Sequence, residues 1–213
     1  MRRHISKGSM PMHREIIAIL RGVQPHEVDS IGDVLIEGGI STIEVPLNSP
    51  DAFESISKLA RRFGTVAQIG AGTVLDQDDV RRVADVGGQI IVSPDTSPKV
   101  IQATKAANLS SYPGVMTPTD CFTALGNGAD GLKFFPSSVL GISGFKALSA
   151  VLPTNVRTYA VGGAGPENFK AWLSAGITGF GIGSALYRAG FSPSDVASRA
   201  NDIVTSYDLA ASQ

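Results

Sequence analysis

The sequence predicts a single (β/α)8 barrel, a fold of the α/β class in which each of eight parallel strands is followed by a helix. Short β-branched apolar runs alternate with longer stretches of helical periodicity from residue 16 onward. Glycines that can end helices recur at intervals of about 20 to 25 residues, the length of one compact strand–helix unit. The chain has 213 residues, of which 43% are hydrophobic. It is long enough for one substantial core and too short for two typical domains with a linker.

Eight apolar runs are the predicted strands. They are Ile16–Arg21, Thr42–Pro46, Ala67–Gly72, Gln89–Ser93, Ser110–Gly114, Gly131–Phe135, Arg157–Val161 and Gly179–Ile182. Eight parallel strands with short connections close most simply into a barrel, and an open doubly wound sheet is the alternative.

Helix starts are indicated between these runs by a proline or a capping side chain in the first turn. These signals are Gln24-Pro25, Ser49-Pro50, Asp76, Ser97-Pro98, Thr117-Pro118 and Gly165-Pro166. The barrel domain is therefore predicted to span residues 14–213.

Residues 1–13 are excluded from the predicted fold. Gly8-Ser9-Met10 has the pattern of a vector-derived junction ahead of a native start, and a mobile natural leader would have the same pattern. The segment lacks the apolar core of a secretion signal, and no run of about 18 apolar residues predicts a membrane span.

The composition favours a small-molecule ligand. Lysine and arginine number 18 against 19 aspartates and glutamates, so no field of one sign favours nucleic acid or a membrane surface. Cys121 is the single cysteine, which excludes an intramolecular disulfide and fits a reducing cytoplasm. His4, His13 and His26 lie before or just inside the first unit, so no metal site and no cofactor are predicted.

Two charged residues interrupt predicted strands, and both fall where a barrel builds its active site, toward the carboxyl ends of the strands. Lys133 lies in Leu132–Phe135 and Glu44 lies in Ile43–Pro46. A buried ammonium must find a counter-charge or lose its proton, and a lysine with a lowered pKa is a nucleophile. The pair therefore predicts a nucleophile and a general acid/base. The alternatives are a lysine that reaches solvent and a purely structural ion pair.

A phosphate site is predicted after the seventh and eighth strands, where glycine lets backbone N–H groups approach an anion. The residues are Gly162, Gly163, Gly183 and Ser184. Glycines that only turn the chain would give the same pattern.

Further strand-end residues are candidates for the carboxylate and keto end of a substrate. Arg21 offers a planar, permanently charged donor, Thr73 offers a hydroxyl, and Pro113 ends the fifth run. A surface ion pair and ordinary strand-end turns are the alternatives.

Five motifs in this order resemble the pyruvate-dependent class I aldolases that cleave 2-keto-3-deoxy-6-phosphogluconate or its galactonate epimer. The resemblance runs from about residue 16 to 207. The motifs are Ile19-Leu20-Arg21-Gly22, Ile43-Glu44-Val45-Pro46-Leu47-Asn48-Ser49-Pro50, Ile69-Gly70-Ala71-Gly72-Thr73-Val74, Lys133-Phe134-Phe135-Pro136 and Val161-Gly162-Gly163.

The resemblance implies roles for these residues and an oligomeric state. Lys133 matches the Schiff-base lysine and Glu44 the general acid/base, while Arg21 and Thr73 match positions that hold the pyruvate carboxylate. Gly162, Gly163, Gly183 and Ser184 match the family's phosphate site. Such enzymes are usually homotrimers, and their ligands are the phosphorylated keto sugar acid, pyruvate and glyceraldehyde 3-phosphate.

Two positions favour the galactonate branch of this family. The gluconate branch typically carries arginine or threonine in the segment after the catalytic glutamate, and threonine directly before the Gly-Gly pair. Here Asn48 lies in that segment and Val161 precedes the pair. A valine removes a hydrogen-bond donor near the carbon-4 hydroxyl and so alters which epimer is held productively. The alternatives are gluconate or 4-hydroxy-2-oxoglutarate cleavage, a phosphosugar isomerase, and a noncatalytic phosphosugar-binding barrel.

Overall fold

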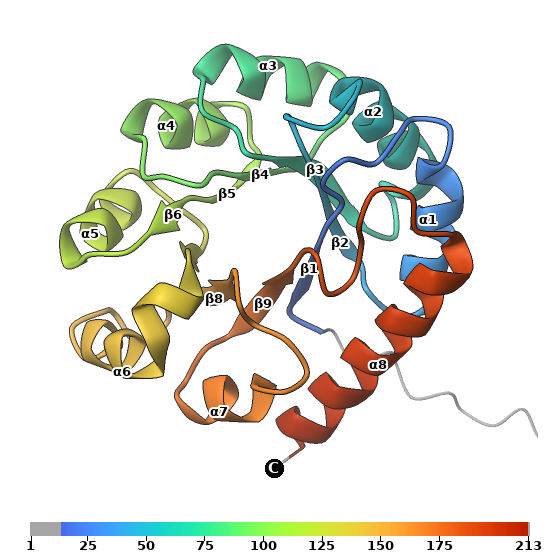
Figure 1. Cartoon of the computed structure of the whole chain (residues 1–213). Coiled ribbons are helices and arrows are strands. Elements are labelled where there is room, and N and C mark those ends of the chain that lie inside the picture. Colours follow the sequence, from blue (N-terminus) through green and yellow to red (C-terminus); the bar gives the residue numbers. More distant parts are fainter. Residues whose placement is uncertain (1–13, 213) are drawn as a thin grey trace, which may run out of the picture.

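The computed structural model describes residues 14–212, which form a ring of strands surrounded by helices (Figure 1). The prediction for residues 1–13 lies outside the described residues. The strands are β1 (Ile16–Ile19), β2 (Thr42–Pro46), β3 (Gln68–Gly72), β4 (Ile90–Val92), β5 (Ser110–Tyr112), β6 (Gly114–Val115), β7 (Leu132–Phe134), β8 (Thr158–Val161) and β9 (Gly179–Ile182).

The sheet is parallel throughout and runs in the order β5-β4-β3-β2-β1-β9-β8-β7-β6. Its two ends, β5 and β6, are halves of the single strand predicted over Ser110–Gly114, and they are separated only by Pro113. Proline has no N–H to donate to a ladder, so the strand is interrupted there. Because the end strands adjoin in the sequence, the sheet closes, and the prediction of a (β/α)8 barrel rather than an open sheet is confirmed.

The helices form the outer ring in Figure 1. They are α1 (Val28–Glu37), α2 (Ala52–Phe63), α3 (Gln77–Asp85), α4 (Pro98–Ala106), α5 (Pro118–Gly126), α6 (Ser137–Ser149), α7 (Phe169–Ser174) and α8 (Pro193–Ala211). None of the helices in the described part of the chain is long and apolar enough to cross a membrane.

Two of the predicted helix starts are capped by side chains as expected. Asp76 accepts a hydrogen bond from the Asp78 N–H at 2.7 Å at the start of α3. Thr117 and Asp120 form a reciprocal capping box on α5. The Gln24-Pro25, Ser49-Pro50 and Gly165-Pro166 signals fall instead in turns just ahead of α1, α2 and α7.

The alternation of side chains along the strands separates two apolar layers. One layer fills the barrel and the other packs between the barrel and the helices. The inner layer consists of Ile17, Ile19, Ile90, Val92, Tyr112, Tyr159 and Val161. Glu44 and Lys133 are the buried charged residues among those described, and both belong to the inward-facing rows of β2 and β7.

Candidate active site

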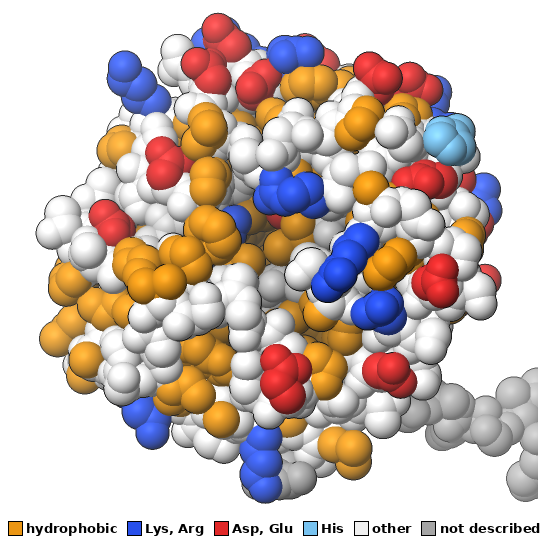
Figure 2. Space-filling model, viewed as in Figure 1, with side chains coloured by type: hydrophobic (Ala, Val, Ile, Leu, Met, Phe, Trp, Pro, Cys, Tyr) orange, Lys and Arg blue, Asp and Glu red, His pale blue; other side chains and the backbone are white. Residues whose placement is uncertain are grey.

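Lys133 and Glu44 face a common cavity inside the barrel. Lys133 is the central residue of β7 and is 7% exposed, while Glu44 is the central residue of β2 and is 1% exposed. Both line the same narrow internal cavity, together with Tyr112, Tyr159 and Val161. The fold thus brings the two sequence-predicted catalytic residues together from strands on different sides of the ring. Figure 2 shows the barrel end hollowed near its middle, with apolar side chains in its depth.

Burial shifts the pKa values of the two groups toward each other. Loss of hydration raises the pKa of the Glu44 carboxyl to about 7, although the charges of Lys133 and Arg21 act in the opposite direction. Burial also lowers the pKa of the Lys133 ammonium, against the attraction of Glu44, and the charge of Arg21 lowers it further. The lowered pKa favours the neutral amine of Lys133, and near neutral pH the Glu44 carboxyl is able to give or take a proton.

No hydrogen bond or close ion pair joins these side chains in the described part of the chain. The Oε2 atom of Glu44 is buried without a hydrogen-bond partner. The Nζ atom of Lys133 lies 4.7 Å from the ring centroid of Phe135, an aromatic face that favours a cation there. A buried carboxylate oxygen with no partner is costly in a purely structural pair, which favours a functional role over that alternative.

Three polar residues meet at the mouth of the barrel. The Arg21 guanidinium donates hydrogen bonds to Asn48 Oδ1 at 2.5 Å and to Thr73 Oγ1 at 3.4 Å. Thr73 has a φ of 56°, a left-handed conformation that a β-branched residue rarely adopts. Such strain is tolerated where the surroundings fix a side chain for a purpose. The structure thus joins Arg21 and Thr73, both predicted for the carboxylate end, with Asn48, predicted for specificity.

A second cavity of about 350 Å³ opens beside this mouth. Its lining includes all four residues of the predicted phosphate site, which are Gly162, Gly163, Gly183 and Ser184. Gly162 and Gly163 have φ values of 81° and 100°, so the loop after β8 requires glycine at both positions. The Gly162 carbonyl accepts hydrogen bonds from Ser137 Oγ at 2.9 Å and from the Ser138 N–H at 2.8 Å. The loop is therefore anchored to the start of α6.

Val161 connects the two cavities. Its side chain is 5% exposed and lines both the internal cavity of Lys133 and the glycine-lined cavity. Ile19 and Gly181 also line both cavities, so a group bound between the Lys133 amine and the glycine loop lies near these three residues, and position 161 is suited to sense substrate stereochemistry.

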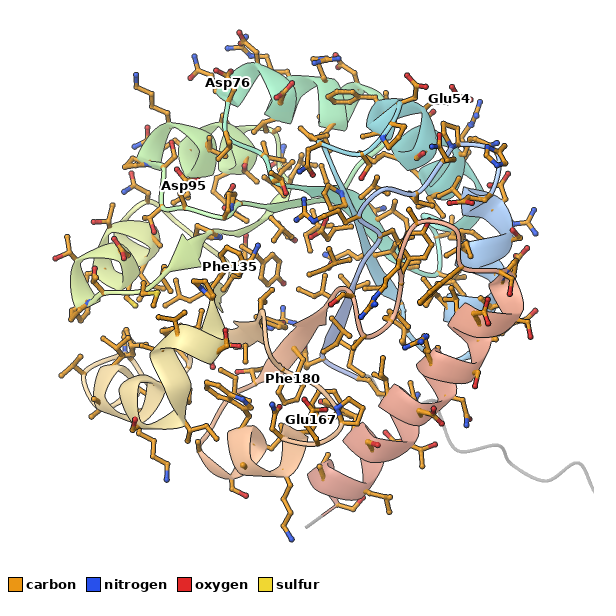
Figure 3. The ribbon with its side chains drawn as sticks, in the orientation of Figure 1. Glu54, Asp76, Asp95, Phe135, Glu167 and Phe180 are labelled. Atoms are coloured by element: carbon orange, nitrogen blue, oxygen red, sulfur yellow. The ribbon has the colours of Figure 1, made fainter. Side chains whose placement is uncertain are left out.

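The structure also places Pro113, which was predicted for the keto end of the substrate, and it adds residues that the sequence analysis missed. Pro113 lies at the break between β5 and β6, and its carbonyl accepts the Lys133 backbone N–H at 2.9 Å. Glu167, just ahead of α7, lines the glycine-lined cavity together with Phe135, and both are labelled in Figure 3. Gly72 contacts the Glu44 carboxylate. Of the histidines, His26 is exposed ahead of α1, and His4 and His13 lie outside the described residues.

The fold and the site together define a barrel enzyme built around a buried lysine amine, with a carboxyl group in the same cavity and a glycine-lined cavity at the mouth. The family model for the KDPG and KHG aldolases matches residues 9–200. The chain belongs to this family of aldolases.

Relatives and solved structures agree with this assignment. The chain is 48% identical over 198 residues to the "Probable 2-dehydro-3-deoxy-6-phosphogalactonate aldolase" of Rhizobium meliloti (strain 1021), covering 93% of each chain. It is 44% identical over 192 residues to the 2-dehydro-3-deoxy-6-phosphogalactonate aldolase of Escherichia coli (strain K12), covering 90% of this chain and 94% of that one.

Two solved structures share the fold over nearly the whole chain. A structure described as native KDPGal has a TM-score of 0.92 and 43% identity, covering 93% of this chain and 96% of that chain. A KDPG aldolase from Legionella pneumophila, with pyruvate captured as a covalent carbinolamine intermediate, has a TM-score of 0.78 and 25% identity. It covers 92% of this chain and 94% of that chain.

Proposed function

We propose that this chain is a class I aldolase that cleaves 2-dehydro-3-deoxy-6-phosphogalactonate to pyruvate and D-glyceraldehyde 3-phosphate through an imine on Lys133. The observation that carries the proposal is the buried pair of Lys133 and Glu44 in one cavity beside a glycine-lined pocket. The aldolase names of relatives at 48% and 44% identity support the same reaction.

The reaction begins at the Lys133 amine, which burial favours in its neutral form. The nitrogen lone pair attacks the keto carbon of the substrate, and the hydroxyl of the resulting carbinolamine takes up a proton and leaves as water, which gives a cationic imine. Glu44 then accepts the proton of the carbon-4 hydroxyl. As the carbon-4 oxygen becomes the aldehyde carbonyl, the bond between carbons 3 and 4 breaks and its electron pair moves into the imine, which becomes an enamine.

Glu44 also completes the cycle. Its carboxyl group, whose pKa burial raises to about 7, returns the proton to carbon 3 of the enamine. Water then hydrolyses the imine and releases pyruvate, and the Lys133 amine is restored. One residue can serve as base and then as acid because its pKa lies near the working pH.

Binding of the substrate's two charged ends orients the scissile bond. Arg21 and Thr73 are suited to hold the carboxylate, since they already share a hydrogen bond at the mouth. The backbone around Gly162 and Gly183 is suited to hold the phosphate. Binding energy at the phosphate then contributes to catalysis by fixing the distance between the keto carbon and Lys133.

Val161 favours the galactonate epimer in this proposal. It offers a methyl group where a threonine would offer a hydroxyl, and it lies between the two cavities, close to the path of carbon 4. A site that lacks a hydrogen-bond donor discriminates against the epimer that needs one. Asn48, held by Arg21, is the second specificity residue in the proposal.

We also propose that the enzyme is a cytoplasmic homotrimer. Apolar side chains gather over the side of the barrel that carries α5 and α6 (Figure 2), where Phe122 is 49% and Val139 is 71% exposed. Exposed apolar surface of this kind favours association with another chain. Cys121 is a buried free thiol, which fits a reducing compartment. Light scattering of the purified protein tests the trimer, and a monomer at micromolar concentration would contradict it.

The decisive experiment is reductive trapping. Incubation with pyruvate and sodium borohydride makes an imine permanent, and peptide mass spectrometry locates it. We expect a single adduct on Lys133, no adduct in Lys133→Met, and an unchanged adduct in Lys146→Met, which removes an exposed lysine of α6. Rates with both epimers then establish the substrate. Absence of an adduct in folded protein would favour a phosphosugar isomerase or a noncatalytic binding barrel.

A further inference from the structure

We propose that Gly72 is a positioning residue for the reaction, because its missing side chain leaves the space that the Glu44 carboxylate occupies beside Lys133. The kinetic part of this inference rests on the proposed function. The structural part rests only on the contacts between β2 and β3.

The register of these two strands brings Gly72 against the carboxylate. Glu44 pairs with Gly70, and Pro46 pairs with Gly72. Residues two apart on a strand share one face, so positions 44, 70 and 72 all face the barrel interior. A Cβ atom at Gly72 would overlap Oε2, Cδ and Oε1 of Glu44, and no other heavy atoms lie as near.

The backbone itself does not require glycine at this position. The φ angle of Gly72 lies outside the left-handed range, in contrast to Gly162 and Gly163. Its neighbour is also the end of a side chain, unlike the backbone neighbours of the inward-facing Gly70 and Gly114. A Cβ at Gly70 would overlap the Ile90 carbonyl, and a Cβ at Gly114 would overlap the Pro94 carbonyl. Those two glycines permit close packing of the backbone, whereas Gly72 makes room for a carboxylate.

The surroundings of Glu44 make this space important for its position. The Oε2 atom has no hydrogen-bond partner, so no donor fixes this oxygen in place. The side chain is 1% exposed, and its location is therefore set by the walls around it. A single methyl group at position 72 would turn the carboxylate away from Lys133 without altering its chemistry.

The test uses exchange of the pyruvate methyl protons in D2O, which requires both the imine and the general base. We expect Gly72→Ala to slow exchange by about 10²-fold, the size of a typical general-base contribution. The borohydride adduct on Lys133 should still form on long incubation. The matched control is Gly126→Ala at the end of α5, where a Cβ would meet nothing within 4 Å, and it should exchange at the wild-type rate.

A double-variant comparison tests whether Gly72 acts through Glu44. With Glu44→Ala the obstructing carboxylate is gone, so adding Gly72→Ala should slow exchange no further. An additional tenfold loss in the double variant, or near-normal exchange in Gly72→Ala alone, would overturn the proposal. If Gly72→Ala fails to fold, recovery of folding in the double variant supports the clash with Glu44, and misfolding of both overturns it.

A crystal structure of Gly72→Ala provides a readout independent of activity. We expect the Glu44 carboxylate to be displaced while β2 and β3 keep their register, and an undisplaced carboxylate would contradict the inference. Failure of the proposed function would instead be visible in the wild-type protein, as the absence of a pyruvate adduct. The two failures are therefore distinguishable.

Discussion

Replacing Glu44 by glutamine should change how the stability of the fold depends on pH. The glutamine keeps the shape of the side chain and removes its titration. In the folded protein, burial raises the pKa of the Glu44 carboxyl from 4.5 to about 7. Between these two values the folded protein holds a proton that the unfolded chain releases, so the free energy of unfolding falls as the pH rises through this window.

The magnitude follows from the width of the window. At about 1.4 kcal/mol for each pH unit, the difference between 4.5 and about 7 corresponds to about 3 kcal/mol. Between pH 4 and pH 8.5 the free energy of unfolding of the wild type should therefore fall by about 3 kcal/mol relative to that of the Glu44→Gln variant. For a domain of this size that amounts to about 6–12 °C in Tm. Lys133, whose pKa burial lowers, acts in the opposite direction, because the folded protein releases this proton at a lower pH than the unfolded chain does.

Urea unfolding at a series of pH values measures this difference, because effects of the substitution that do not depend on pH cancel between the two ends of the series. Glu54→Gln on α2 is the matched control, since it removes the same charge from an exposed side chain (Figure 3). If the free energies of unfolding of wild type and Glu44→Gln run parallel from pH 4 to pH 8.5, burial does not raise the pKa of the Glu44 carboxyl.

Four further outcomes are expected. The rate of cleavage should rise as the pH rises through about 7, because Glu44 must lose its proton to act as base. The pH–rate profile of Glu44→Gln should lack this rise. Lys133→Met should abolish turnover of either epimer in a coupled assay of triose phosphate release. Val161→Thr should shift the ratio of kcat/KM toward the gluconate epimer by roughly 10-fold, and an unchanged ratio would remove Val161 as a specificity residue. Thr73→Gly should raise the free energy of unfolding by about 1 kcal/mol, because it relieves a strained φ, while raising KM for pyruvate; lower stability in chemical denaturation would contradict the strain argument.

Local patterns in the sequence were sufficient for the architecture and for the two catalytic candidates. Periodicity distinguishes strands from helices, and a charge inside an apolar strand stands out because burying it is costly. Lys133 and Glu44 were identified in this way, and the structure places both in one cavity.

Contacts that depend on register could not be predicted from the sequence. Gly72 is the last residue of a predicted strand, and its contact with Glu44 exists only because β2 and β3 pair as Pro46 with Gly72. Predicting the break of the fifth strand at Pro113 would have required knowing that Tyr112 pairs with β4 and Gly114 with β7. The capping box of Ser192 and Asp195 on α8 had a sequence signal, and a search for serine three residues before aspartate would have found it.

The two tyrosines beneath Lys133 have a consequence for the order of events during turnover. Tyr112 and Tyr159 stack edge to face with centroids 5.3 Å apart, and their rings close the narrow internal cavity against a second hollow at the opposite end of the barrel. Tyr159 donates a hydrogen bond to Glu15 at 2.7 Å, and Arg157 donates one to Tyr112 at 3.0 Å, which holds both rings in place. The two rings thus separate the cavity of Lys133 from the opposite end of the barrel. In the proposed reaction, the pyruvate carbons stay attached to Lys133 at this closed end after cleavage, so the triose phosphate departs first, and in the reverse direction pyruvate must bind before the aldehyde.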